Sequence, residues 1–210
     1  MSKLLYIQAS PRVARSHSIA VADAFVKSYR QSHPADKVVS FNLFTKDLPA
    51  FDEAAANAKY KIMHGQPHSK EEAQAWKSVE TLIQQFKSAD KYVFTVPMWN
   101  FGVPYRLKQY LDVILQPSYT FSFSPTEGYK GLVTGKPALA IYARGGEYGD
   151  GPASAGYDFQ KRYMELTLGF MGFKDVKSII VEPTLAGGPQ AAQAKRSAAI
   201  AKAIELAKGF

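Results

Sequence analysis

Short apolar runs alternate with longer amphipathic stretches along this chain. Runs with the length and the β-branched or aromatic content of buried strands occur at residues 4–7, 38–41, 92–96, 138–142 and 176–181. Between and after them, apolar residues recur at helical spacing, which predicts helices at about 19–29, 73–86, 104–115, 155–169 and 189–208. Regular alternation of strand and helix is typical of a parallel sheet with helices on both faces. The pattern therefore predicts a doubly wound α/β fold with a five-stranded parallel sheet.

Capping signals support two of these helices. Ser69 and Glu72 have the spacing of a capping box before the stripe that begins at Ala73. Either Ser16 or Ser18 is placed to cap the first helix.

Two segments interrupt the alternation. Residues 43–68 contain prolines and a glycine among short periodic pieces, and we expect a long excursion there with one helical turn around 52–63. Residues 117–136 begin with a strand-like piece and continue with spaced glycines, which predicts a hairpin.

Composition places the chain among ordinary globular proteins. Its 210 residues are 46% apolar and 21% charged, with a mean hydropathy of −0.20, which suits one domain spanning 1–210. Cysteine is absent, so disulfides, thiolate metal sites and cysteine nucleophiles are excluded, and a reducing compartment is favoured. The first apolar run is too short for an export signal, and no run is long enough to span a membrane. We expect a cytoplasmic protein.

The net charge of +8 raises the question of a polyanionic partner. The basic residues are dispersed, no block of five like charges occurs, and no nucleic-acid-binding motif accompanies them. We interpret the charge as a solvated surface and expect no nucleic-acid partner. A basic polyanion-binding module remains the least favoured hypothesis.

Ligands of open parallel sheets bind beyond the carboxyl ends of the strands. The first loop at this edge, 9–18, brings hydroxyl and guanidinium groups to a helix N-terminus, where an anion is favoured. It lacks the glycines of a dinucleotide fingerprint, which favours a single phosphate monoester. Helix capping alone is the alternative explanation for its serines.

The other two loops at this edge are also unusual. Residues 97–104 place two aromatic side chains, a methionine and an asparagine between two prolines, a composition suited to contact with a planar ring. Residues 143–151 contain four glycines, which allow backbone N–H groups to approach a ligand. Packing of the aromatic residues under the loop, and a merely flexible glycine loop, are the alternatives.

Other catalytic patterns are weak. His64 and His68 are separated by Gly65 and Pro67, so helical metal-ligand geometry is not expected, and we predict no metal site. The chain has no G-x-S-x-G elbow, and its Gly131–Lys136 stretch lacks the Ser or Thr of a P-loop.

At these loops the sequence resembles the FMN-dependent NADH-azoreductases, a branch of the flavodoxin-like quinone reductase superfamily. Besides Ser-Pro-Arg and Ser-His-Ser in the first loop, the most specific segments are 97–101, 131–136, 144–146 and 168–172. The resemblance covers essentially the whole chain, and it implies a flavodoxin-like fold.

The resemblance also implies where FMN binds. The first loop would hold the phosphate, Met98 to Phe101 would line the isoalloxazine ring, and Ala143 to Gly146 would meet its pyrimidine edge. Many members carry serine where Ala143 stands, which removes a hydroxyl here and leaves backbone contacts. A cation such as Arg144 would stabilise the negative charge that flavin gains at its N1 side. The predicted cofactor-binding residues are Ser10, Ser16, His17, Ser18, Met98, Trp99, Asn100, Phe101, Ala143, Arg144, Gly145 and Gly146.

Family members are homodimers with the flavin at the subunit interface, and their hairpin contributes aromatic residues to the substrate pocket. By that resemblance, Phe121 and Phe123 are the predicted substrate-binding residues. The implied activity is ping-pong reduction of azo compounds to amines and of quinones to hydroquinones, with NADH as donor and no catalytic side chain. The alternative is a flavodoxin-type electron carrier without enzymatic activity. The two long excursions argue against it, because a carrier exposes its flavin edge.

Overall fold

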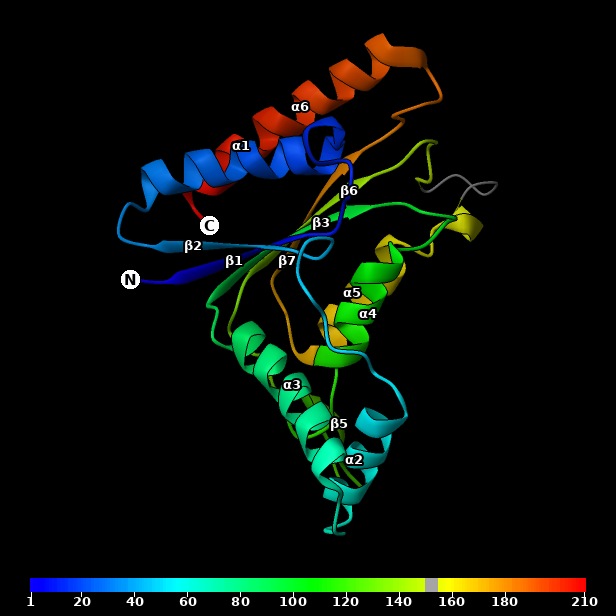
Figure 1. Cartoon of the computed structure of the whole chain (residues 1–210). Helices are drawn as coiled ribbons and strands as arrows, with labels where there is room; N and C mark the ends of the chain where they lie inside the picture. The colour runs from blue at the N-terminus through cyan, green and yellow to red at the C-terminus, as the bar shows by residue number, and fades with distance from the viewer. Residues whose placement is uncertain (150–154) are drawn as a thin grey trace.

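The computed structural model describes residues 1–149 and 155–210. One parallel sheet runs through it in the order β2-β1-β3-β6-β7 (Figure 1). All five predicted strands are confirmed, each extended by at most a few residues. Their bounds are β1 Lys3–Gln8, β2 Lys37–Asn42, β3 Lys91–Pro97, β6 Ala138–Ala143 and β7 Val176–Val181.

Helices cover both faces of the sheet, as the alternation predicted. One face carries α1 (His17–Ser32) and α6 (Gly188–Lys208), and the other carries α3 (Lys70–Lys87), α4 (Tyr105–Ile114) and α5 (Lys161–Met171) (Figure 1). Successive strand residues point to opposite faces. Along β1, Leu4 and Tyr6 therefore belong to the core under α1 and α6, whereas Leu5 and Ile7 belong to the core under the other three helices.

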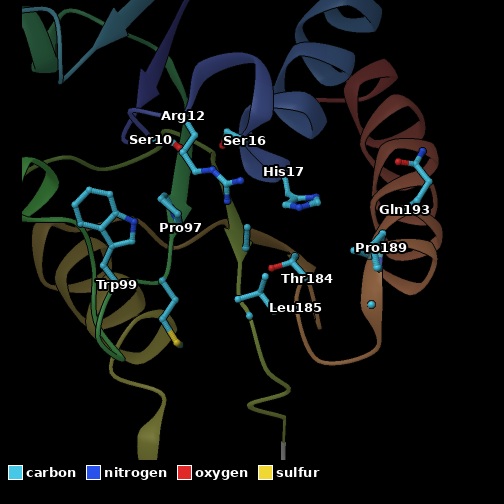
Figure 2. Close-up of a pocket in the computed structure, with 15 residues that line it drawn as sticks. Ser10, Arg12, Ser16, His17, Pro97, Trp99, Thr184, Leu185, Pro189 and Gln193 are labelled. Carbon is cyan, nitrogen blue, oxygen red and sulfur yellow. The ribbon is translucent and has the colours of Figure 1, made fainter.

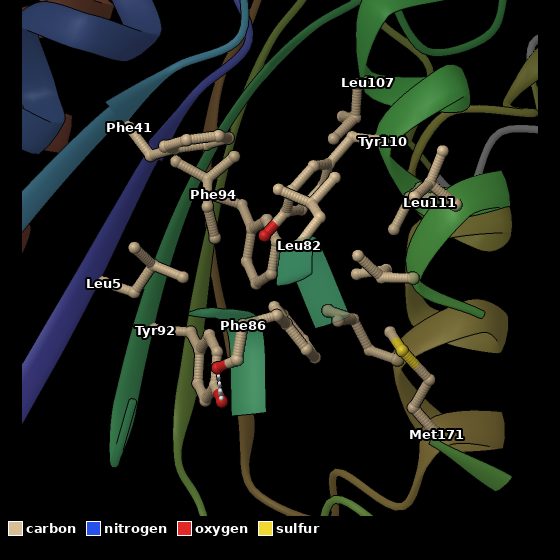
Figure 3. Close-up of a cluster of buried hydrophobic side chains, with 14 of the residues drawn as sticks. Leu5, Phe41, Leu82, Phe86, Tyr92, Phe94, Leu107, Tyr110, Leu111 and Met171 are labelled. Atoms are coloured by element: carbon tan, nitrogen blue, oxygen red, sulfur yellow. Dashed lines mark hydrogen bonds between the residues drawn. The ribbon is translucent and has the colours of Figure 1, made fainter. Parts of the chain in front are cut away.

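Aromatic side chains fill the core on the α3 side (Figure 3). The rings of Phe86 and Tyr92 lie 4.8 Å apart, and the Tyr92 hydroxyl donates a hydrogen bond of 2.7 Å to the Phe86 carbonyl. Phe94 and Tyr110 are buried beside them. This packing lies against β3, the central strand of the sheet, whose carboxyl end opens toward the site described below.

The excursion at 43–68 is more ordered than the sequence suggested. Where one helical turn was expected around 52–63, the chain forms an 11-residue helix, α2, at Glu53–Met63. The Asp52 side chain caps it by accepting the Ala55 N–H at 3.1 Å. Lys61 then reaches Glu72 at 2.6 Å, which ties α2 to α3. Tertiary contact with α3 thus stabilises a helix whose own periodicity is weak.

The helix expected at 155–169 begins later. A 3-10 turn occupies Ala155–Tyr157, and α5 starts only at Lys161. The carboxylate of Asp158 accepts the N–H groups of Gln160 and Lys161 at 3.2 and 2.8 Å, so the chain turns there before the helix begins. The last two residues of the predicted 143–151 loop lie outside the described residues.

The hairpin predicted within 117–136 is confirmed. Strands β4 (Phe121–Ser124) and β5 (Gly128–Gly131) pair antiparallel and pack against the end of α5. The backbones touch closely, because a Cβ on Gly131 would lie 2.3 Å from the Gly172 nitrogen. The capping box at Ser69 is also confirmed, and Ser16 rather than Ser18 caps α1.

No helix within residues 1–149 and 155–210 is both long and apolar enough to cross a membrane.

Candidate functional site

A cavity of about 410 Å³ opens where the central strands end (Figure 2). Its walls come from the segments that follow β1, β3, β6 and β7, together with the first turns of α1 and α6. This is the edge at which parallel α/β sheets bind ligands. The predicted cofactor-binding residues that line it are Ser10, Ser16, His17, Met98, Trp99, Ala143 and Gly145.

Hydroxyl groups gather at the N-terminal end of α1. The Ser16 Oγ accepts the Ile19 N–H at 3.3 Å and lies 3.2 Å from the Ser18 Oγ. Both serines and Ser10 are buried. Since Ser16 caps the helix and also lines the cavity, the two explanations offered for this loop are not alternatives. Free N–H groups of a first helical turn, with hydroxyls beside them, form an anion site.

Positive charge surrounds the same end of the cavity. Figure 2 shows the Arg12 side chain extending into the space near His17. Burial, and then the charges of Arg196 and Arg12, lower the pKa of His17 below its ordinary value. Its Nδ1 atom is buried and has no hydrogen-bond partner among the described residues. A phosphate group would compensate the two guanidinium charges and offer acceptors to this end of the cavity.

The loop after β3 provides an apolar wall. Trp99 and Gly102 exchange two backbone hydrogen bonds of 3.0 Å, and Asn100 and Phe101 adopt positive φ angles of 47° and 69° between them. Met98 donates its N–H to the carbonyl of Ala143 at 2.8 Å, which joins this loop to the one after β6. Met98 and Trp99 therefore face the cavity from a tight, well-bonded turn.

Asn100 and Phe101 lie at the tip of that turn and do not line the cavity. The Phe101 side chain is 47% exposed, and its ring lies 5.4 Å from that of Tyr157. Ser18 is buried behind Ser16, and Gly146 is one residue beyond the lining Gly145.

The Arg144 side chain points away from the cavity. It is 2% exposed and forms ion pairs with Asp158 at 2.8 Å and Glu182 at 3.3 Å. Its neighbours Ala143 and Gly145 line the cavity, so residue 144 contributes its backbone to the wall and its guanidinium to the protein interior. Its charge is already balanced by two carboxylates, which weakens the case for Arg144 as the cation beside a reduced ring.

Phe121 and Phe123 are not brought to this cavity within one chain. They lie on the β4–β5 hairpin, where the Phe121 ring is 4.8 Å from Phe170 in the last turn of α5. The first turn of α5 follows Asp158 and Gln160 near the cavity. An 11-residue helix is about 16 Å long, so the hairpin is roughly one helix length away.

One wall of the cavity was missed by the sequence analysis. It comes from the connection between β7 and α6, which is not among the three loops predicted to bind the ligand. The carboxyl end of β7 lies at the same sheet edge. The turn-forming Gly187-Gly188-Pro189 sequence before α6 could have indicated a fourth loop there. The residues that it adds are Thr184, Leu185, Gly188, Pro189, Ala192 and Gln193.

The cavity thus combines the N-terminal end of α1 and its serine hydroxyls with an apolar wall and glycine-lined backbone. In residues 1–149 and 155–210, no cluster of three or more His, Asp or Glu side chains is placed to hold a metal ion. A ligand with one phosphate and a flat ring system fits this arrangement, and FMN has both parts.

Comparisons with known proteins agree with the fold. A family model described by its flavodoxin-like fold matches residues 2–206. This chain belongs to that family. It is 53% identical over 210 residues to an FMN-dependent NADH:quinone oxidoreductase of Nitratidesulfovibrio vulgaris, covering 100% of both chains. A protein of the same name from Desulfotalea psychrophila is 49% identical, with 99% of this chain and 97% of that protein covered.

Solved structures of two azoreductases superpose closely on this chain. An azoreductase of Bacillus anthracis has a TM-score of 0.92 and 32% sequence identity, with 100% of each chain covered. Another solved structure, of an FMN-dependent NADH-azoreductase from Bacillus anthracis in complex with FMN, has a TM-score of 0.87 and 30% identity over 99% of this chain and 100% of that one.

Proposed function

We propose that this chain is an FMN-dependent reductase that uses NADH to reduce quinones to hydroquinones and azo compounds to amines. The observation that carries this proposal is the cavity at the strand ends, with an anion site at one end and the Met98–Trp99 wall beside it. The full-length similarity to FMN-dependent NADH:quinone oxidoreductases supports the same activity.

In this proposal the first loop holds the phosphate through Ser10, the 16–18 segment and the first N–H groups of α1. Met98 and Trp99 provide the stacking surface, and the backbone of 143–146 meets the polar edge of the ring. Arg12 balances the phosphate charge. The redox chemistry, hydride acceptance at flavin N5 and electron delivery to an acceptor, would come from bound FMN.

We infer a ping-pong order because the donor and the acceptor would have to enter the same cavity in turn. The electron count then sets the stoichiometry. A quinone takes two electrons and consumes one NADH, whereas cleavage of an azo bond to two amines takes four electrons and consumes two NADH and two protons.

We also propose that the active form is a homodimer. Phe159 and Leu166 are 63% and 71% exposed, and they line an apolar groove together with Val103 and Tyr163. Exposed apolar surface of this kind beside a cavity is typical of a protein interface. A second copy seated on it would bring a hairpin, with Phe121 and Phe123, toward the cavity that the same hairpin does not reach in its own chain.

The test is NADH consumption by the purified protein with FMN, first with a benzoquinone and then with an azo dye, with no other protein present. We expect one NADH per quinone and two per azo bond. An electron carrier would instead need a partner protein, so absence of turnover with every quinone and dye would overturn the enzyme proposal.

A further inference from the structure

A buried network beneath the cavity joins three of the four strand ends that form its walls, those of β3, β6 and β7. We propose that Arg144 and Gln160 are positioning residues, which set the spacing of the cavity walls for FMN without touching it. This rests on the proposed function, namely that the cavity binds FMN.

Arg144 is the centre of the network. Its Nε donates to the Gln160 Oε1 at 2.8 Å, its Nη2 donates to Asp158 at 2.8 Å, and its Nη1 donates to Glu182 at 3.3 Å. The guanidinium is 1% exposed. Its three partners come from the start of α5 and from the residue after β7, so one side chain joins three segments that are distant in sequence.

Gln160 extends the network to the third wall. Its Nε2 donates at 2.6 Å to the carbonyl of Val96, two residues before Met98. Gln160 is fully buried, and both ends of its amide are used. A displacement of the Arg144 side chain would therefore displace Gln160 and, through it, the end of β3, where the apolar wall begins.

The network also fixes the wall that the sequence analysis missed. The Thr184 N–H and hydroxyl both donate to the Arg144 carbonyl at 2.8 Å, and Glu182 accepts the Tyr148 N–H at 3.0 Å. The loops after β6 and β7 thus share hydrogen bonds on both sides of Arg144. Thr184 and Leu185 line the cavity directly above these bonds.

A buried ionic cluster of this kind stabilises a fold less than apolar packing does. Burying one guanidinium with two carboxylates carries a desolvation penalty that apolar packing of the same volume avoids. What it provides is directional geometry, because the planar guanidinium holds three acceptors at fixed angles and lysine would not. The position of the network, directly beneath the cavity, is where directional geometry matters.

The test replaces Gln160 by methionine, which keeps the length of the side chain and removes both hydrogen bonds. Apo-protein would be titrated with FMN by flavin fluorescence quenching, and the bound flavin would be compared by visible circular dichroism. We expect Gln160→Met to raise the FMN Kd by about tenfold or more and to change the visible dichroism. The matched control is Tyr92→Phe, which removes the two buried hydrogen bonds of the Tyr92 hydroxyl at the opposite end of β3 and should leave the Kd within about twofold.

Two further variants keep the proposal testable if Gln160→Met does not fold. Arg144→Lys keeps the charge but not the planar fork and should weaken FMN binding, whereas Glu182→Gln keeps an acceptor oxygen and should bind FMN more tightly than Arg144→Lys does. Wild-type Kd and dichroism in folded Gln160→Met, or in Arg144→Lys, would overturn the positioning role. Failure of the wild-type protein to bind FMN would overturn the proposed function instead.

Discussion

Ser16 shows how one side chain contributes both to folding and to the site. Its Oγ caps α1, and the residue also lines the cavity. Local spacing predicted a cap at Ser16 or Ser18, and the structure assigns it to Ser16, whereas the phosphate contact of Ser16 stays a prediction.

Replacing Ser16 by alanine separates these roles when it is compared with Ser69→Ala. Both substitutions remove an N-cap and should lower the free energy of unfolding by about 1 kcal/mol. Ser69 caps α3 and does not line the cavity. We therefore expect only Ser16→Ala to raise the FMN Kd, measured by fluorescence titration. An equal Kd in the two variants would remove Ser16 from the phosphate site.

Arg144 marks the limit of prediction at the residue scale. Its place in a glycine-rich loop at a strand end indicated a cation for the cofactor. The direction of its side chain depends on Asp158, Gln160 and Glu182, which are distant in sequence. Ion pairs between residues far apart in sequence leave no periodic pattern. The backbone position of residue 144 could therefore be predicted, but the position of its guanidinium could not.

Elements were predictable where a single chain segment determines them. The five strands lie on short, largely apolar runs, and α3 has both a buried stripe and a capping box. By contrast, α2 depends on the Lys61–Glu72 contact with α3, and the start of α5 depends on the Asp158 turn. The first differed from expectation because a tertiary contact stabilises the helix, and the second because a local turn at Asp158 delays the start of the helix.

The hairpin offers a test at the scale of elements. A Cβ on Gly131 would meet Gly172 and Met171 backbone atoms at 2.3 to 2.4 Å, and backbone cannot move aside cheaply. We expect Gly131→Ala to lower the free energy of unfolding by about 1–3 kcal/mol in chemical denaturation. Gly169→Ala, with no atom within 4 Å of its Cβ and a place inside α5, should raise it by up to about 1 kcal/mol. Equal effects would show that the hairpin does not pack closely on α5.

At the scale of the whole molecule, the net charge of +8 is partly explained by the cavity. Arg12 lines it, and Arg196 acts on His17 at its edge. The excess that first raised the question of nucleic acid thus includes Arg12, which lies at the proposed phosphate site. The positions of the charged residues in the folded chain, rather than the net charge, indicate which ligand the protein binds.

Assembly is the second question at this scale. We expect light scattering to give twice the 23.2 kDa of one chain. Leu166→Glu would place a charge on the exposed apolar groove and should shift the protein to monomer. Ile204→Glu, on the exposed side of α6, is the control and should leave the dimer intact. A wild-type monomer would contradict the dimer, and a dimeric Leu166→Glu variant would move the interface elsewhere.

The most direct test of the central claim is an anaerobic titration of the FMN-loaded protein. Addition of NADH should bleach the flavin absorbance with a stoichiometry of one NADH per bound FMN. Subsequent addition of a benzoquinone, with no partner protein, should restore that absorbance and release one hydroquinone. A flavin that stays oxidised in excess NADH, or that is reduced but not reoxidised by any quinone, would contradict the account.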